Sequence, residues 1–96
     1  MLTWILYDIT NNKTRRQIVK NCKNYGLYRV QKSVFLGDIN QNEFDEISLF
    51  FENLIDKDND AVYIFPMCKA DFVKVKLLGQ AFDKELVTDE ILQFFV

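Results

Sequence analysis

The chain has 96 residues, of which 49% are apolar, so its length and composition favour one small folded domain over a disordered segment. Its formal net charge is −2. It contains no histidine, which excludes histidine general bases and imidazole metal sites. Cys22 and Cys68 are too far apart for a CxxC zinc motif, and the slightly negative charge argues at first sight against a polyanionic partner.

The N-terminal part of the chain predicts a strand, a helix and a second strand. Leu2–Tyr7 is a continuous apolar run that is typical of a buried strand. A helix capped by Thr14 is expected to run to about Asn24 and to end before Gly26. Apolar and polar residues then alternate through 27–37, which predicts one strand with a partly polar side.

The remaining signals predict a second helix and two further strands. Asn40 and Glu43 form a capping-box pattern, and the apolar residues of 44–55 recur at helical spacing. We expect a strand over Ala61–Phe65 that Pro66 ends, and another over Val73–Leu78.

We assign these elements to the β-α-β-β-α-β, ferredoxin-like α+β class, with a four-stranded antiparallel sheet and both helices on one face. Residues 1–96 are expected to form a single domain, with a core over 1–79 and a tail over 80–96. The bare face of the sheet predicts a homodimer through the sheets. The apolar end of the tail, Ile91–Val96, is expected to add an extra strand to its own or the partner's sheet.

The charges are divided sharply along the chain. Residues 9–37 contain seven basic side chains and no acid, whereas residues 38–96 contain five basic and 13 acidic ones. The basic segment suits a phosphate-binding surface. A solvated basic helix balanced by the acidic half of the molecule would give the same counts, so both interpretations stay open.

Asp8 is the only acidic residue before position 38, and it follows a predicted buried strand. Its carboxylate can make an Asx turn that leaves the strand. It can also bind Mg²⁺, which takes oxygen ligands and is often held by one or two carboxylates together with substrate phosphates. One aspartate makes a weak site, and two copies across a two-fold axis would make a stronger one. The sequence has no basic leader and no long apolar span, so we expect a cytoplasmic protein without a membrane segment.

The sequence resembles the small CRISPR-associated protein two family in three segments: Tyr7–Asp8–Ile9, the run from Tyr25 to Gly37, and Ala61–Pro66. The resemblance implies a ferredoxin-like homodimer whose last strands complete the partner's sheet. It also implies one of two functions. The first is an Mg²⁺-dependent endonuclease acting on single-stranded RNA or on DNA. The second is a non-catalytic bridge between CRISPR integrase dimers during spacer acquisition in antiviral defence.

The resemblance assigns roles to particular residues. Asp8 matches the metal-ligand aspartate, which would share one Mg²⁺ with its symmetry mate, and Tyr7 stands beside it as a second catalytic candidate. The candidate nucleic-acid-binding residues combine matches to the family with the basic segment: Lys13, Arg15, Arg16, Arg29, Lys32 and Phe35. A ferredoxin-like domain that binds a small regulatory ligand is a third hypothesis, because this scaffold supports many functions.

Overall fold

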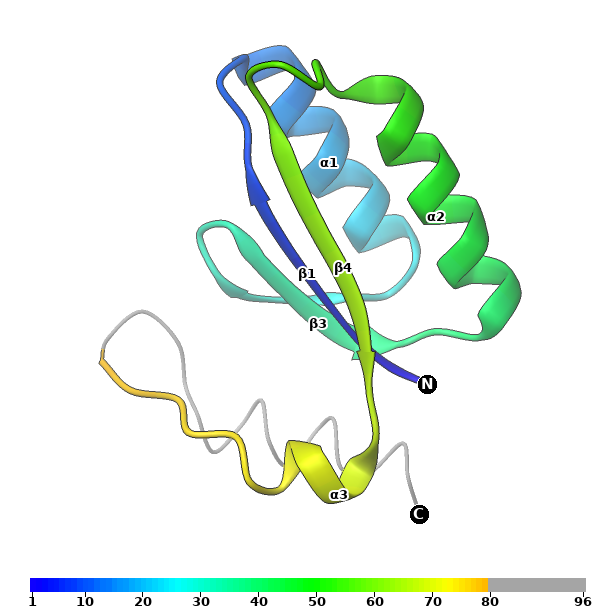
Figure 1. The fold of residues 1–96 in the computed structure, drawn as a ribbon, viewed down its shortest axis with the longest axis vertical. Helices are drawn as coiled ribbons and strands as arrows, with labels where there is room; N and C mark the ends of the chain where they lie inside the picture. The colour runs from blue at the N-terminus through cyan, green and yellow to red at the C-terminus, as the bar shows by residue number, and fades with distance from the viewer. Residues whose placement is uncertain (80–96) are drawn as a thin grey trace.

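A four-stranded sheet organises residues 1–79, the part of the chain that the computed structural model describes. The strand order is β2-β3-β1-β4, and all neighbouring strands are antiparallel. Both long helices cover the same face of the sheet (Figure 1). The predicted ferredoxin-like α+β class is therefore confirmed. The elements in chain order are β1 (Leu2–Asp8), α1 (Asn12–Asn24), β2 (Tyr28–Gln31), β3 (Val34–Asp38), α2 (Gln41–Leu54), β4 (Ala61–Met67) and α3 (Lys69–Phe72).

The central strand β1 has a strand on each side and a packed layer on each face. It pairs with β3 and with β4, and the β4 register runs from Leu2 opposite Met67 to Asp8 opposite Ala61. Successive side chains of a strand point to opposite faces. Ile5 therefore joins the core beneath the helices, and Trp4 joins a second cluster on the other face. This double burial explains why the run is apolar at every position.

The core between the sheet and the helices depends on side chains that are fully buried. Ile18 and Cys22 of α1, together with Ile47 of α2, have no exposed surface, and Phe51 of α2 retains 1%. Burying one large apolar side chain contributes roughly 1.5–3 kcal/mol. This packing holds α1 against the sheet, and α1 carries most of the basic segment.

Local signals start and end the helices. Asn11, and not the predicted Thr14, caps α1, because its side-chain oxygen accepts hydrogen bonds from the backbone N–H groups of Lys13 and Thr14 at 2.8 and 3.2 Å. The capping box that joins Asn40 to the third residue of α2 is present as predicted. Gly26 follows the end of α1 with a φ of 77°, a conformation that favours glycine.

The run 27–37 is a hairpin, so the prediction of one strand was wrong. It contains β2 and β3, joined by a tight turn at Lys32 and Ser33, with Gln31 opposite Val34. The turn lacks the Asn-Gly or Asp-Gly pair that marks most two-residue hairpins. The hairpin supplies the two consecutive strands that the assigned pattern requires between its helices.

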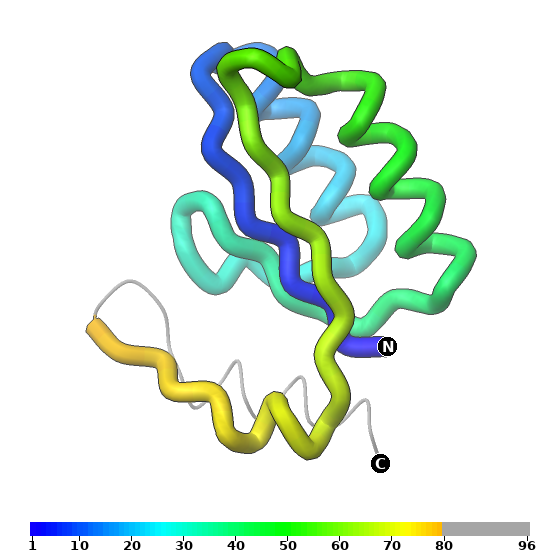
Figure 2. The backbone as a smooth tube through the Cα atoms, viewed as in Figure 1, coloured from blue at the N-terminus to red at the C-terminus, as the bar shows by residue number. Residues whose placement is uncertain are grey.

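The prediction of a strand over Val73–Leu78 was also wrong. After α3 these residues join no sheet, although Val75 and Leu77 pack with Phe72 against the cluster around Trp4. This segment lies apart from α1 and α2 in Figure 2 and partly covers the face of the sheet that was expected to be bare. The tail 80–96 lies outside the described residues, so its extra strand stays a prediction.

The last strand of the sheet, β4, continues to Met67, whereas Pro66 was expected to end it. This strand lies at one edge of the described sheet. An edge strand tolerates proline, because the N–H groups on its outer side have no partner strand. No helix within residues 1–79 is long and apolar enough to cross a membrane.

Gly37 is required by the close approach of two backbone segments. A Cβ atom at this position would lie 2.7 Å from Cδ2 and 3.1 Å from Cα of Leu27. We expect Gly37→Ala to lower the free energy of unfolding by about 1–3 kcal/mol, because the added methyl group would press on the backbone of Leu27 as well as on its side chain. Urea denaturation tests the prediction, and an unchanged midpoint would show that the segment of Leu27 adapts freely.

Candidate nucleic-acid and metal site

Asp8 lies at the end of β1 with an exposed side chain. The side chain before it, Tyr7, packs in the core beneath the helices, so the alternation of the strand directs Asp8 to the face without α1 and α2. Within residues 1–79 its carboxylate makes no hydrogen bond or ion pair, which gives no support to the Asx-turn interpretation. The carboxylate is therefore open to a ligand.

Asp8 provides one oxygen-donor group for a metal ion within a single chain. Among residues 1–79 there is no group of three acidic or cysteine side chains that could hold a metal. An exposed carboxylate with free lone pairs nevertheless fits Mg²⁺, which retains several waters and needs only one or two carboxylates when phosphates complete its shell. A site with two carboxylates requires a second copy of the chain.

Tyr7 does not lie beside the Asp8 carboxylate. Its ring is 5% exposed and stacks on Phe35 at a centroid distance of 6.4 Å. Its hydroxyl donates a hydrogen bond to the carbonyl oxygen of Lys32 at 2.9 Å. Burial raises the pKa of Tyr7, although the nearby Arg29 opposes the shift, so the hydroxyl keeps its proton. This geometry gives Tyr7 a role in holding the β2–β3 turn and not in proton transfer at Asp8.

Phe35 is also placed in the interior. Its side chain has no exposed surface, and the guanidinium of Arg29 lies 5.8 Å from its ring centroid. A buried ring offers no face on which a base can stack, so the expectation that Phe35 contacts nucleic acid is corrected. Its position in β3 makes it the packing surface beneath Arg29.

Arg29 is exposed on β2 and is oriented by the turn that follows it. Its Nε and Nη2 atoms donate hydrogen bonds to the Lys32 carbonyl oxygen at 3.2 and 2.7 Å. The same oxygen therefore accepts from both Arg29 and Tyr7. These contacts direct the guanidinium to the helix side of the sheet, towards α1.

The side chains of α1 and Arg29 line a shallow groove of about 540 Å³. We call it the cationic groove, and its lining residues are Asn12, Arg15, Arg16, Val19, Lys20, Lys23 and Arg29. The two salt bridges found within residues 1–79 join Met1 to Asp38 and Lys57 to Glu52, so none of these cations is neutralised by an acid. This observation favours a phosphate-binding surface over a basic helix paired with the acidic half of the protein.

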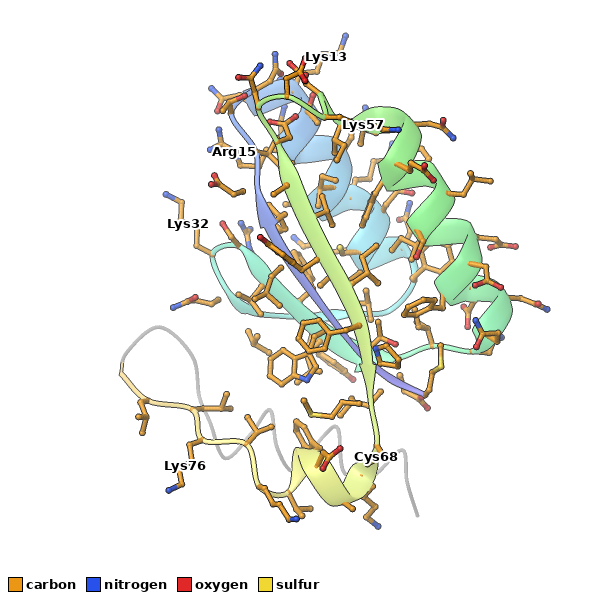
Figure 3. All side chains as sticks on the ribbon, in the orientation of Figure 1. Lys13, Arg15, Lys32, Lys57, Cys68 and Lys76 are labelled. Atoms are coloured by element: carbon orange, nitrogen blue, oxygen red, sulfur yellow. The ribbon has the colours of Figure 1, made fainter. Side chains whose placement is uncertain are left out.

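The structure thus brings together three of the predicted nucleic-acid-binding residues: Arg15, Arg16 and Arg29. Lys13 and Lys32 are exposed outside the groove lining. Figure 3 shows Lys13 at the top of the molecule and Lys32 below Arg15 on the left side. Lys20 and Lys23 were missed as site residues. Their spacing from Arg16 places all three on one face of a helix, and this signal was available in the sequence.

The turn contact of Tyr7 gives a prediction about stability and its dependence on pH. Tyr7→Phe removes one donor to the Lys32 carbonyl and should lower the free energy of unfolding by about 1 kcal/mol at neutral pH. The raised pKa of Tyr7 means that the folded state favours the protonated phenol, so this contribution is present below the ordinary pKa of 10.0 and is lost as the pH rises through the folded-state value. Urea denaturation of both proteins from neutral to alkaline pH measures the difference, and parallel pH profiles would contradict it.

Comparison with known proteins agrees with the resemblance seen in the sequence. A "CRISPR-associated endoribonuclease Cas2" of Desulforudis audaxviator is 38% identical over 71 residues, covering 74% of this chain and 67% of that protein. A relative named "CRISPR-associated endoribonuclease Cas2 1", from Archaeoglobus fulgidus, is 32% identical over 69 residues, covering 72% and 73%. The crystal structure of Streptococcus pyogenes Cas2 at pH 6.5 has a TM-score of 0.71 and 30% identity, covering 82% of this chain and 100% of that one. The family model described as "CRISPR associated protein Cas2" matches residues 1–75, and the chain therefore belongs to the Cas2 family of CRISPR-associated proteins.

Proposed function

We propose that this protein is an endonuclease of CRISPR antiviral defence that hydrolyses phosphodiester bonds in single-stranded RNA or in DNA as an Mg²⁺-dependent homodimer. Two of its relatives carry the name endoribonuclease. The observation that carries the proposal is the Asp8 carboxylate, which is exposed at the end of a buried strand and has no partner within residues 1–79. In this proposal the protein works with the CRISPR integrase during spacer acquisition.

The metal would be held by Asp8 from each of two copies, with the sheet faces that lie away from α1 and α2 turned towards each other. Bound Mg²⁺ polarises a phosphoryl oxygen and lowers the pKa of a coordinated water. Leu6, Val34 and Phe65 line an apolar groove on the same face and keep exposed surface, which would let two copies pack there. Two facing carboxylates repel one another, so the pair favours a cation.

Side chains of the protein bind the substrate, position Arg29 and orient the attacking water. The cationic groove binds the phosphate backbone by charge, which holds the substrate without selecting a sequence. Tyr7 keeps its proton, which it donates in a hydrogen bond to the Lys32 carbonyl oxygen, and so positions the turn that orients Arg29. Because the chain has no histidine, Asp8 is the group placed to orient an attacking water on its face of the sheet.

The first test replaces the carboxylate without changing its size. Asp8→Asn should lower the cleavage of labelled single-stranded RNA and duplex DNA in Mg²⁺ on the order of a hundredfold or more. Binding of the same substrates should change little, because the cationic groove lies on the other face of the sheet. Asp58→Asn, in the exposed turn before β4, removes the same charge elsewhere and should cleave normally. Full cleavage by Asp8→Asn would refute the catalytic proposal.

A second candidate function is a non-catalytic DNA-binding scaffold that bridges integrase dimers. The placement of the cationic groove and of Asp8 on opposite faces of the sheet favours it, because DNA held along α1 needs no metal. If the protein is such a scaffold, the cationic groove contacts DNA. The acidic α2, which carries four acids and no basic residue, is left for a basic surface of the integrase.

Charge reversal in the groove tests the binding common to both functions. Arg16→Glu combined with Lys20→Glu should weaken duplex DNA binding and lower the slope of log affinity against log salt by about one for each phosphate contact that is lost. Lys74→Glu combined with Lys76→Glu makes the same charge change outside the cationic groove and should bind normally. Unchanged binding by the groove variant would contradict both functions. Spacer acquisition by an Asp8→Ala variant then separates them, because only the scaffold tolerates that change.

A further inference from the structure

The loop between β1 and α1 is tied to the loop that precedes β4. The backbone N–H and the hydroxyl of Thr10 both donate hydrogen bonds to Oδ1 of Asp60, at 3.0 and 3.1 Å. Oδ2 of Asp60 accepts the backbone N–H of Asp56 at 3.0 Å. One carboxylate thus fixes two chain segments that are 50 residues apart.

The tied loop lies between the candidate catalytic and binding groups. Asp8 precedes Thr10 on the chain and stands opposite Ala61, the residue after Asp60, in the β1–β4 register. Arg15 follows, and its Nη2 donates hydrogen bonds to the Thr10 carbonyl oxygen at 3.5 Å and to Oδ1 of Asn12 at 2.7 Å. The Arg15 guanidinium is therefore held chiefly by Asn12, and a longer contact with the Thr10 carbonyl oxygen links it to the loop.

Arg15, in the first turn of α1, contacts this loop and does not extend freely into solvent. Its Nε atom is buried without a hydrogen-bond partner within residues 1–79, and its side chain is only partly exposed. A guanidinium oriented by a fixed carbonyl loses less freedom when it binds a phosphate than one that moves freely. The contacts of Thr10 therefore affect how well Arg15 can serve in the cationic groove.

We propose that Asp60 is a positioning residue that acts through Thr10 to orient Asp8 and Arg15 for their substrate. This inference rests on the proposed function, because it supposes that Asp8 and Arg15 face a nucleic acid. Asp60 suits the role because each of its oxygens accepts from a different segment. An asparagine would turn its NH₂ group towards one of those donors.

The hydrogen bonds also keep Asp60 charged. They come from the backbone N–H groups of Thr10 and Asp56 and lower the pKa of the Asp60 carboxyl. The neighbouring Asp56 has a comparable local role, because its two oxygens accept from the backbone of Asp58 and from the side chain of Asn59. The acidic run 56–60 therefore orders its own loop with these contacts.

The test is a double-mutant cycle on the full chain, measured with a labelled single-stranded RNA in a chelating buffer, where cleavage does not interfere. Asp60→Asn should weaken binding on the order of threefold to tenfold. In an Arg15→Ala background, Asp60→Asn should cause no further loss of affinity, because the effect of Asp60 on binding depends on Arg15. Asp58→Asn is the matched control and should bind normally. Each variant is used below its own melting transition, which circular dichroism determines.

Thr10 variants keep the test decisive if Asp60→Asn folds poorly. Thr10→Ser retains the hydroxyl donor and should bind normally, whereas Thr10→Val removes it and should share the loss. If Asp60→Asn lowers the affinity as much in the Arg15→Ala background as it does in the otherwise unchanged protein, the inference is overturned. Such a result would show a general effect on the fold. A change in melting temperature with no change in affinity would overturn it as well.

A cleavage assay in Mg²⁺ separates failure of this inference from failure of the proposed function. Asp60→Asn is expected to lower kcat as well as affinity, because Asp8 is the last residue of β1 and stands opposite Ala61, the residue that follows Asp60. If Asp8→Asn cleaves normally while the Asp60 and Arg15 effects overlap, the catalytic proposal fails and the link to Arg15 stands. If Asp8→Asn abolishes cleavage and Asp60→Asn changes neither kcat nor affinity, the inference about Asp60 fails alone.

Discussion

The alternation of side chains along β1 is the constraint on which the functional arrangement depends. The strand is hydrogen-bonded on both sides, so none of its residues can turn to the other face without breaking a ladder. Tyr7 therefore packs beneath the helices, and Asp8 is directed to the opposite face. The carboxylate and the cationic groove consequently occupy different surfaces of one small domain. A substrate that meets both must pass around the edge of the sheet or extend across two copies.

The binding surface is organised by backbone oxygens more than by ion pairs. The Lys32 carbonyl orients Arg29, and the Thr10 carbonyl contacts Arg15, while no acid neutralises either guanidinium within residues 1–79. A carbonyl can direct a guanidinium without cancelling its charge. The cations therefore remain available to phosphates even though the whole chain has a net charge of −2. The distribution of charge along the sequence was therefore a better guide to this cationic surface than the total charge.

The sequence predicted the fold class, the position of Asp8 at the end of a buried strand and the clustering of basic side chains on the first helix. It failed where tertiary contacts decide the structure. The turn at Lys32 and Ser33 carries no glycine, asparagine or aspartate, so 27–37 was interpreted as one strand. Val73–Leu78 alternates because one side packs on the sheet and the other faces solvent, a pattern that arises without any strand partner. Phe35 lies in a family motif, but only packing shows that its ring is enclosed.

We propose that the Asp8 carboxylate, on the face away from the cationic groove, forms a metal site only when two copies of the chain meet. The most direct measurement is the stoichiometry of Mn²⁺, a spectroscopic substitute for Mg²⁺, titrated into the full-length protein and followed by electron paramagnetic resonance. We predict one tightly bound ion for every two chains and none in the Asp8→Asn variant. One ion for each chain, or tight binding that survives in Asp8→Asn, would contradict the account.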